Sequence, residues 1–207
     1  MAKAVLLFSG GIDSTVLLYM LLSKGVDVYS LFIDYGHKAS KAEEKAVTAI
    51  SSRLKLNTKI IRLKELRLLL PNVHNLRRSP FYYPYRNTLF ITLAAMNAYA
   101  LGSNSIFVGL SSTYLQRASF PNATGDFVSK MNELLGMYGH GVKVYAPLIG
   151  IEKSVIVRIG NKLGVPFHLT YSCYHGGEVH CGKCPACLNR KLAFRKAGIN
   201  DSTVYAK

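Results

Sequence analysis

Residues 5–21, VLLFSGGIDSTVLLYML, pass from a continuous apolar run into an apolar helical pattern through a short polar turn. The run predicts a buried strand over residues 4–8, and the pattern predicts a helix over residues 14–24. Two glycines and an acid occupy the turn between them. A glycine-rich turn from a strand into a helix directs backbone N–H groups outward at the positive end of the helix dipole. The sequence therefore predicts an anion-binding turn at residues 9–14.

This turn differs from the two commonest phosphate-binding motifs. No Gly-Lys-Ser/Thr follows it, as a Walker A loop requires, and the spacing of its glycines does not fit G-x-G-x-x-G. The alternative to a ligand site is a plain tight turn in which Ser14 is the N-cap of the helix.

Apolar runs and helical patterns alternate along the rest of the chain. Further strands are predicted at residues 26–33, 58–63, 105–110 and 142–146, and helices at residues 41–54, 87–101, 127–137 and 152–163. This alternation predicts an α/β fold, a doubly wound parallel sheet with helices on both faces and ligands at the carboxyl ends of the strands. Two long connections, residues 64–86 and 111–126, follow strands and are expected to lie over that edge.

The composition is that of a basic folded chain. Its 207 residues are 49% hydrophobic and 18% charged, enough for one domain with a full core and an appendage. The net charge of +15 favours polyanionic partners such as nucleotides or nucleic acid, with a generally basic surface as the alternative. No run approaches the roughly 20 apolar residues of a membrane span, and Asp13 interrupts any secretory segment. A cytoplasmic protein without a membrane partner is expected.

All four cysteines lie within residues 173–187. They are Cys173, Cys181, Cys184 and Cys187, with spacings x7, x2 and x2. In a reducing compartment this pattern indicates a metal site rather than disulfides. Two short Cys-x2-Cys units suit a closed, tetrahedral zinc site, and an iron–sulfur cluster is the alternative. His175 and His180 are expected to lie nearby without binding the metal.

The turn at residues 9–14 resembles the PP-loop signature of the ATP pyrophosphatases and fits it without a departure. Members of that superfamily adenylate a carbonyl or carboxylate oxygen, release pyrophosphate and let a nitrogen or sulfur nucleophile displace AMP. The resemblance implies that ATP binds here and that Asp13 positions Mg²⁺, since an acid beside phosphate needs a cation between them. The nucleotide-binding residues that it implies are Phe8, Ser9, Gly10, Gly11, Ile12, Asp13, Ser14, Thr15, Val16, Leu17, Leu18 and Asp34.

A PP-loop followed by this cysteine cluster resembles the 7-cyano-7-deazaguanine (preQ0) synthase family, and the resemblance covers nearly the whole chain. YRNTLF at residues 85–90 is similar to that family's G/A-R-N-x-x-F segment, and CGKCPAC at residues 181–187, followed by Arg190, fits its zinc segment. The resemblance implies a PP-loop domain at residues 1–165 with a zinc-binding element at residues 166–207 packed on it. It also implies that the four cysteines hold a structural Zn²⁺.

The resemblance implies an ATP-dependent carbon–nitrogen ligase of queuosine or archaeosine biosynthesis. Such an enzyme adenylates the carboxylate of 7-carboxy-7-deazaguanine, forms the amide with ammonia, and dehydrates the amide to the nitrile preQ0. A homodimer is expected, and a nucleic-acid partner is compatible with the basic charge but not required. The expected catalytic residues are Asp13, Ser14 and Arg86. The expected substrate residues are Arg86, Asn87, Phe120, Asn122 and Asp126.

One segment departs from the family pattern. Where the family reads approximately Y-P-D-C-R-x-E-F, residues 120–127 read FPNATGDF, so Asn122 replaces an acid suited to the N–H edge of a purine-like base. This favours, as an alternative, a paralogue that transfers the adenylated acyl group to an amine of a protein or nucleic acid. A second alternative is a PP-loop enzyme that thiolates tRNA, and a third is a nucleotide-binding regulator without turnover.

Three basic residues have two interpretations each. Arg86 either binds an oxyanion or contacts a carbonyl at the start of a helix. Lys153 either reaches the phosphates or is solvated. Arg190, with the lysines and arginine that follow it, either contacts RNA or lies on a solvated helix face.

Overall fold

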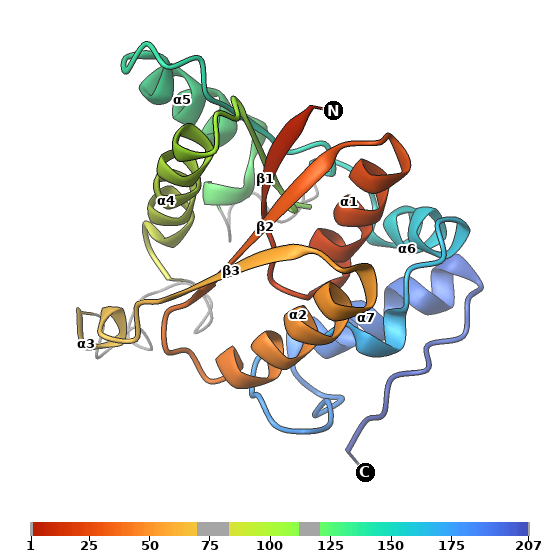
Figure 1. The fold of residues 1–207 in the computed structure, drawn as a ribbon. Helices are drawn as coiled ribbons and strands as arrows, with labels where there is room; N and C mark the ends of the chain where they lie inside the picture. Colours follow the sequence, from red (N-terminus) through yellow and green to blue (C-terminus); the bar gives the residue numbers. More distant parts are fainter. Residues whose placement is uncertain (1, 70–82, 112–120, 207) are drawn as a thin grey trace.

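The computed structural model describes residues 2–69, 83–111 and 121–206, and within them a five-stranded parallel sheet lies between two layers of helices (Figure 1). The strands lie in the order β3-β2-β1-β4-β5, and every neighbouring pair is parallel. Their bounds are β1 Lys3–Leu7, β2 Asp27–Asp34, β3 Asn57–Arg62, β4 Ser105–Val108 and β5 Lys143–Tyr145. The prediction of a doubly wound α/β fold is confirmed.

The predicted helices are present, with ends within a few residues of those expected. The helical elements are α1 Ile12–Ser23, α2 Ser40–Leu54, α3 Leu66–Leu69, α4 Arg86–Ala100, η3 Pro121–Ala123, α5 Gly125–Gly136, α6 Lys153–Lys162, η4 Phe167–Leu169 and α7 Pro185–Ala197. Helix α7 was not among the elements predicted from apolar periodicity. Its buried face includes a cysteine and an arginine beside Ala193 and Phe194, so the apolar pattern is weak although the face is buried.

Each face of the sheet has its own apolar core. One core holds side chains of α1, α2, α6 and α7, and the other holds side chains of α4 and α5. Successive side chains of β1 point into opposite cores, because side chains alternate along a strand. Leu6 lies in the core with α1, α2, α6 and α7, and Val5 lies in the core with α4 and α5. A strand buried on both faces reads as a continuous apolar run, which is why residues 4–8 carry no polar alternation.

The direction in which strands are added reverses at β1. The chain passes from β1 to β2 and β3 on one side, and β4 and β5 lie on the other side. In open α/β sheets the crevice at the carboxyl ends of the strands beside such a reversal binds the ligand. Gly109, directly after β4, lies here, and a Cβ atom on it would be 2.8 Å from the backbone nitrogen of Ser14. The exit of β4 therefore packs directly on the turn that follows β1.

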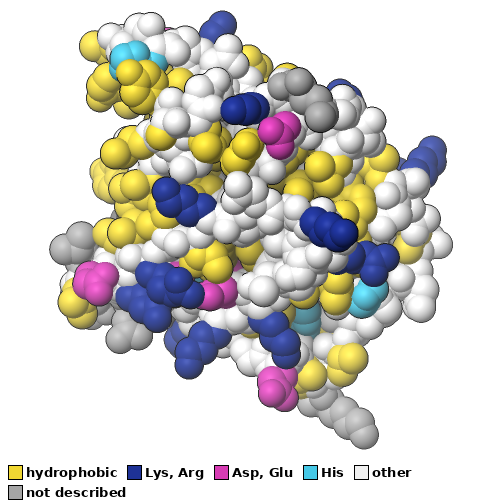
Figure 2. Space-filling view, in the orientation of Figure 1, with side chains coloured by type: hydrophobic (Ala, Val, Ile, Leu, Met, Phe, Trp, Pro, Cys, Tyr) yellow, Lys and Arg dark blue, Asp and Glu magenta, His cyan; other side chains and the backbone are white. Residues whose placement is uncertain are grey.

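The surface is basic and carries some exposed apolar side chains. Figure 2 shows lysine and arginine side chains scattered over the face in view, with few acidic ones between them. Several large apolar side chains on and after α4 and α5 are exposed, namely Met96, Tyr99, Leu134, Met137 and Tyr138. Across the described parts of the chain, no helix combines the length and the apolarity that crossing a bilayer demands.

The buried Arg190 of α7 ties the C-terminal segment together. Its side chain is 1% exposed, and it donates to both carboxylate oxygens of Asp201, to Thr170 Oγ1 at 2.8 Å and to the carbonyl oxygen of Phe167 at 3.0 Å. Burial would raise the pKa of the Asp201 carboxyl, but the hydrogen bonds from Arg190 and Tyr205 hold this pKa below its ordinary value. The solvated helix face expected for Arg190 is therefore wrong for this residue.

We expect the variant Arg190→Met to lower the free energy of unfolding by about 3–5 kcal/mol, because it leaves a mostly buried carboxylate without its cation. Arg195→Met, on the exposed face of the same helix, is the matched control and should change it by less than about 0.5 kcal/mol. Urea unfolding followed by circular dichroism measures both values. Equal effects of the two substitutions would contradict this role of Arg190.

Candidate active site and metal site

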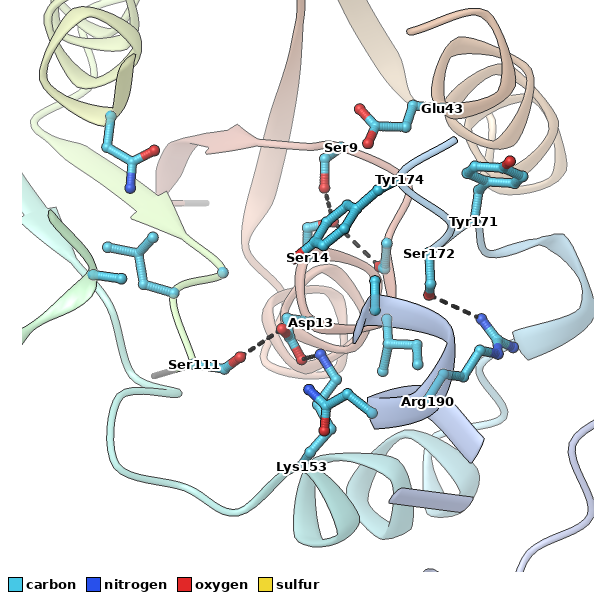
Figure 3. Close-up of a pocket in the computed structure, with 18 of the residues that line it drawn as sticks. Ser9, Asp13, Ser14, Glu43, Ser111, Lys153, Tyr171, Ser172, Tyr174 and Arg190 are labelled. Carbon is cyan, nitrogen blue, oxygen red and sulfur yellow. Dashed lines mark hydrogen bonds and ion pairs between the residues drawn. The ribbon is translucent and has the colours of Figure 1, made fainter. Parts of the chain in front are cut away.

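Two adjoining hollows, of about 330 and 370 Å³, lie at the carboxyl ends of β1, β2 and β4. They share lining residues from the turn at residues 9–14, from α2 and from the start of α4. The first hollow is the more polar and extends to α6 and α7 (Figure 3). The second is the more apolar and extends beneath Phe32, Ile33 and Phe90. Together they form one cavity at the expected edge of the sheet, here called the cavity.

The turn at residues 9–14 presents the start of α1 to the cavity. Gly11 is the N-cap and provides no side chain for the first-turn N–H groups, so these can receive an anion. Ser9 Oγ and Ser14 Oγ are 3.2 Å apart at this point (Figure 3). Gly10 has φ +70°, and a Cβ on it would meet Ala46 of α2 at 2.9 Å. The N-cap is therefore Gly11 rather than Ser14, and the turn has the form of an anion site.

Asp13 is held between two other elements. Its Oδ1 lies 2.5 Å from Lys153 Nζ, in an ion pair whose angles are not those of a hydrogen bond, and its Oδ2 accepts a hydrogen bond from Ser111 Oγ at 2.6 Å. Lys153 is the first residue of α6, and Ser111 follows β4 (Figure 3). A carboxylate and an ammonium group beside free N–H donors can bind a polyphosphate together with a hard cation. Of the two interpretations of Lys153, the structure supports the position in the cavity.

Arg86 begins α4 and lines both hollows. Its Nη1 donates to Tyr35 Oη at 2.9 Å, and its Nε donates to the side-chain Oδ1 of Asn87 at 3.4 Å. The Tyr35 ring stacks on His37 with centroids 4.2 Å apart, and burial raises the pKa of Tyr35 to about 12. The hydroxyl therefore stays protonated and holds the guanidinium group at the cavity wall.

The C-terminal segment forms one wall of the cavity. Tyr171, Ser172 and Tyr174 line it, and so do Ala186, Asn189 and Arg190 of α7. The backbone N–H of Tyr171 donates to the carbonyl oxygen of Gly10 at 2.9 Å, which joins this segment directly to the turn. The site is therefore built by both ends of the chain.

The four cysteines converge on one point. The sulfur atoms of Cys173, Cys181, Cys184 and Cys187 all lie within 4.8 Å of one another, and none is in a disulfide. Two of the separations are 3.9 and 4.0 Å. A tetrahedral ion with metal–sulfur bonds of about 2.3 Å requires sulfur separations of about 3.8 Å. The thiolates of a cubane cluster bind separate irons and stand farther apart. The spacing fits a single four-coordinate ion.

The surroundings of the sulfur atoms also suit a metal. The backbone N–H groups of Lys183 and Cys184 point at Cys181 Sγ at 3.5 and 3.3 Å, and they lower the pKa of this thiol to about 6. His180 is not part of the cluster. Its Nε2 accepts the backbone N–H of Ser172 at 3.0 Å, and burial lowers the pKa of the ring to about 4, so it stays neutral.

The other predicted nucleotide-binding residues are divided between the cavity and the core. Phe8 and Ile12 line the hollows. The side chain of Thr15 turns back to the carbonyl oxygen of Gly11 at 2.7 Å. Asp34 lines a different hollow beside α2 and accepts the N–H of Gly36 at 2.9 Å. Val16, Leu17 and Leu18 lie in the core beneath the turn and do not line the cavity.

The predicted substrate residues are divided in the same way. Asn87 and Asn122 both line the cavity, and Asn87 Nδ2 donates to the carbonyl oxygen of Asn122 at 2.8 Å. Asp126 is exposed on α5 and does not line it. Phe120 lies outside the described residues.

Several lining residues were not identified from the sequence. Glu43, Ser111, Tyr171, Ser172 and Tyr174 enter the cavity from three separate segments (Figure 3). The only available signal was position, because Ser111 starts a long connection after a strand and Tyr174 follows a cysteine. Residue type alone does not distinguish them from ordinary surface residues.

Comparison with known proteins places these features in a family. The family model described as "Queuosine biosynthesis protein QueC" matches residues 3–198. A 7-cyano-7-deazaguanine synthase of Picrophilus torridus is 37% identical over 99% of this chain and 92% of the relative. One of Methanothrix thermoacetophila is 35% identical over 99% of both chains.

Solved structures share the fold at low sequence identity. A U34-tRNA thiolase from Methanococcus maripaludis, which carries a [4Fe-4S] cluster, has a TM-score of 0.56 at 16% identity, with 93% of this chain and 64% of that chain covered. A 4-thiouridine synthetase in complex with RNA and ATP has a TM-score of 0.56 at 22% identity, with 95% and 50% covered. These two likenesses show the fold alone. The family match over almost the whole length shows more, and the chain belongs to the QueC family.

Proposed function

We propose that this chain is an ATP-dependent 7-cyano-7-deazaguanine synthase. The observation that carries the proposal is its similarity, over nearly the full length, to relatives with that name. The cavity supports it, because an open helix start, the Asp13–Lys153 ion pair and an apolar hollow meet at one edge of the sheet. The substrates would be 7-carboxy-7-deazaguanine, ATP and ammonia.

The polyphosphate of ATP would bind the N–H groups at the start of α1, with Ser9 and Ser14 beside it. Asp13 would hold Mg²⁺, which when bound neutralises charge that develops on pyrophosphate. Lys153 is already at the Asp13 carboxylate and would move to a phosphate oxygen, so that positive charge stays where pyrophosphate leaves. These residues position and neutralise, and none of them forms a covalent bond with the substrate.

The carboxylate of the deazaguanine acid would lie beside Arg86 and Asn87. One carboxylate oxygen bonds to the α-phosphorus of ATP while the bond to pyrophosphate breaks. Ammonia then adds to the activated carbon and displaces AMP, which gives the amide. A second ATP then adenylates the amide oxygen, with release of a second pyrophosphate, and loss of AMP, which carries that oxygen away, together with two protons leaves the nitrile. The guanidinium group of Arg86 stabilises the oxyanion in these steps.

One structural observation favours the alternative function, in which the acyl group is transferred to an amine of a macromolecule. Asn122 and Ala123, which replace the Asp and Cys of the family pattern, line the cavity. An acyl-adenylate formed here could pass to an amine of a protein or nucleic acid. The tRNA-thiolating alternative has only the basic net charge and the shared fold to support it.

We propose Zn²⁺ as the ion of the four-cysteine site, because one tetrahedral ion fits the sulfur spacing. Reduced thiols in such a site are consistent with the cytoplasm. The homodimer expected from the sequence stays a prediction, for which the exposed apolar side chains on and after α4 and α5 offer a surface.

Mass spectrometry of a reaction with ATP, Mg²⁺, 7-carboxy-7-deazaguanine and ammonia should find the nitrile, AMP and pyrophosphate. The same mixture without ammonia is the control and should give no nitrile. Pyrophosphate release without amide or nitrile, even at high ammonia concentration, would favour the amine-transfer alternative. If wild-type enzyme releases no pyrophosphate with this acid, the proposed substrate is wrong.

Asp13→Asn should reduce acid-dependent pyrophosphate release by roughly a hundredfold or more, since it removes the charge that positions Mg²⁺ at the phosphates. The fold should persist, because the Asp13 side chain lies at the cavity and not in an apolar core. Asp27→Asn, at the opposite end of the sheet, is the matched control and should retain activity. Normal turnover by folded Asp13→Asn would contradict the role of this turn.

Elemental analysis of purified protein should find about one zinc per chain in a colourless preparation. Cys184→Ser should lose the metal and lower Tm by roughly 5–10 °C, because a structural ion contributes free energy of folding. Leu188→Ser, at an exposed position on α7, the helix that Cys184 precedes, should have a much smaller effect. A brown preparation with iron and labile sulfide would instead indicate a cluster.

A further inference from the structure

Glu43 is a charged cavity residue that the proposed nucleotide chemistry does not use. It lies in the first turn of α2 and lines both hollows, with its side chain 25% exposed. In Figure 3 its carboxylate lies on the same side of the cavity as Ser9 and Tyr174. A negative charge here would repel a polyphosphate. A ligand group that donates hydrogen bonds would suit this position.

The protein contacts of Glu43 leave room for such a group. Its Oε2 lies 3.1 Å from His37 Nε2, and His37 Nδ1 is 2.8 Å from Ser40 Oγ. This chain of contacts, from the residue His37 before α2 to the first residue of α2, holds the carboxylate in position. A carboxylate has about four acceptor positions on its two oxygens, so one contact with histidine does not exhaust it.

The opposite charge of the site lies close by. Arg86 lines the same two hollows as Glu43. Burial would lower the pKa of Arg86, but Tyr35 and Glu43 raise it on balance. A ligand that carries an anion at one end and N–H donors at the other can use both side chains at once.

The 7-deazaguanine ring of the proposed substrate has this arrangement. Its carboxylate is an oxyanion for Arg86, and its N1–H and 2-amino groups form a pair of parallel donors on the far edge. Two parallel N–H groups match the two oxygens of a carboxylate, as they do in arginine–carboxylate pairs. Where the family pattern has an acid in the loop, this chain has Asn122, which lines the same cavity. We propose that Glu43 is the specificity-determining residue that binds the N1–H and 2-amino edge of the base, an inference that rests on the proposed function.

The test compares two ligands and four full-length, metal-loaded proteins by calorimetry. The ligands are 7-carboxy-7-deazaguanine and its analogue without the 2-amino group, and a non-hydrolysable ATP analogue reports on the nucleotide site. In Glu43→Gln the Kd of the acid should rise about tenfold or more, because a charge-assisted pair of hydrogen bonds is lost. The Kd of the ATP analogue should stay within about twofold, and the preference for the 2-amino ligand should largely vanish.

Two variants serve as controls for Glu43→Gln. Glu44→Gln changes the neighbouring residue, which pairs with Arg62 at 2.6 Å outside the cavity, and should leave all three affinities unchanged. His37→Asn removes the contact that orients Glu43 but keeps its carboxylate, so it should reduce the preference for the 2-amino ligand less than Glu43→Gln does. If His37→Asn abolishes the preference while Glu43→Gln retains it, Glu43 does not bind this edge and the inference is overturned.

The wild-type protein also tests the inference, and this measurement does not depend on whether a variant folds. It should bind the analogue without the 2-amino group at least about tenfold more weakly than the acid. Equal binding of the two ligands overturns the role of Glu43, whereas nitrile formation would still support the proposed function. If wild-type protein neither binds nor converts the acid, the proposed function itself fails and the inference fails with it.

Discussion

The close packing of backbone against the turn at residues 9–14 is the constraint on which the site depends. Helix α2 lies against Gly10, and the exit of β4 lies against Ser14 at Gly109. At neither glycine is there room for a Cβ atom, so a side chain would push the turn away from its neighbours. Because three segments meet here without side chains between them, the N–H groups of α1 are held open toward the cavity. The exposed start of α1 is thus a product of packing.

The C-terminal segment makes the metal site and the cavity parts of one structure. Tyr171 is bonded through its backbone to Gly10, and Ser172 and Tyr174, on either side of Cys173, line the cavity. Arg190 joins α7 to the same segment through Thr170 and Asp201. A metal held by the four cysteines would therefore fix one wall of the cavity. This gives a structural ion a direct effect on the site without any part in the chemistry.

Charged side chains of both signs line the cavity. Lys153 and Arg86 contribute positive charge, and Asp13 and Glu43 contribute negative charge at separate places. Asp13, in the first turn of α1, is paired with Lys153 of α6, and this pair suits a site for a cation and phosphates. Glu43 is paired with His37, which suits a neutral donor edge. Groups of both signs in one cavity favour a ligand whose own functional groups are complementary to them.

The sequence by itself determined the fold class, the glycine-rich turn from β1 into α1 and the grouping of the cysteines, because each depends on residues close together along the chain. Continuous apolar runs identify strands buried on both faces, and the cysteine spacing limits the geometry of a metal site. Only the tertiary structure decided that Lys153 meets Asp13, that Arg190 is buried and that Glu43 enters the cavity. It also separated Val16, Leu17 and Leu18, which lie in the core, from the turn residues that line the cavity. These outcomes depend on contacts between distant segments, and local patterns of polarity carry no information about which surface residues the packing of the sheet brings together.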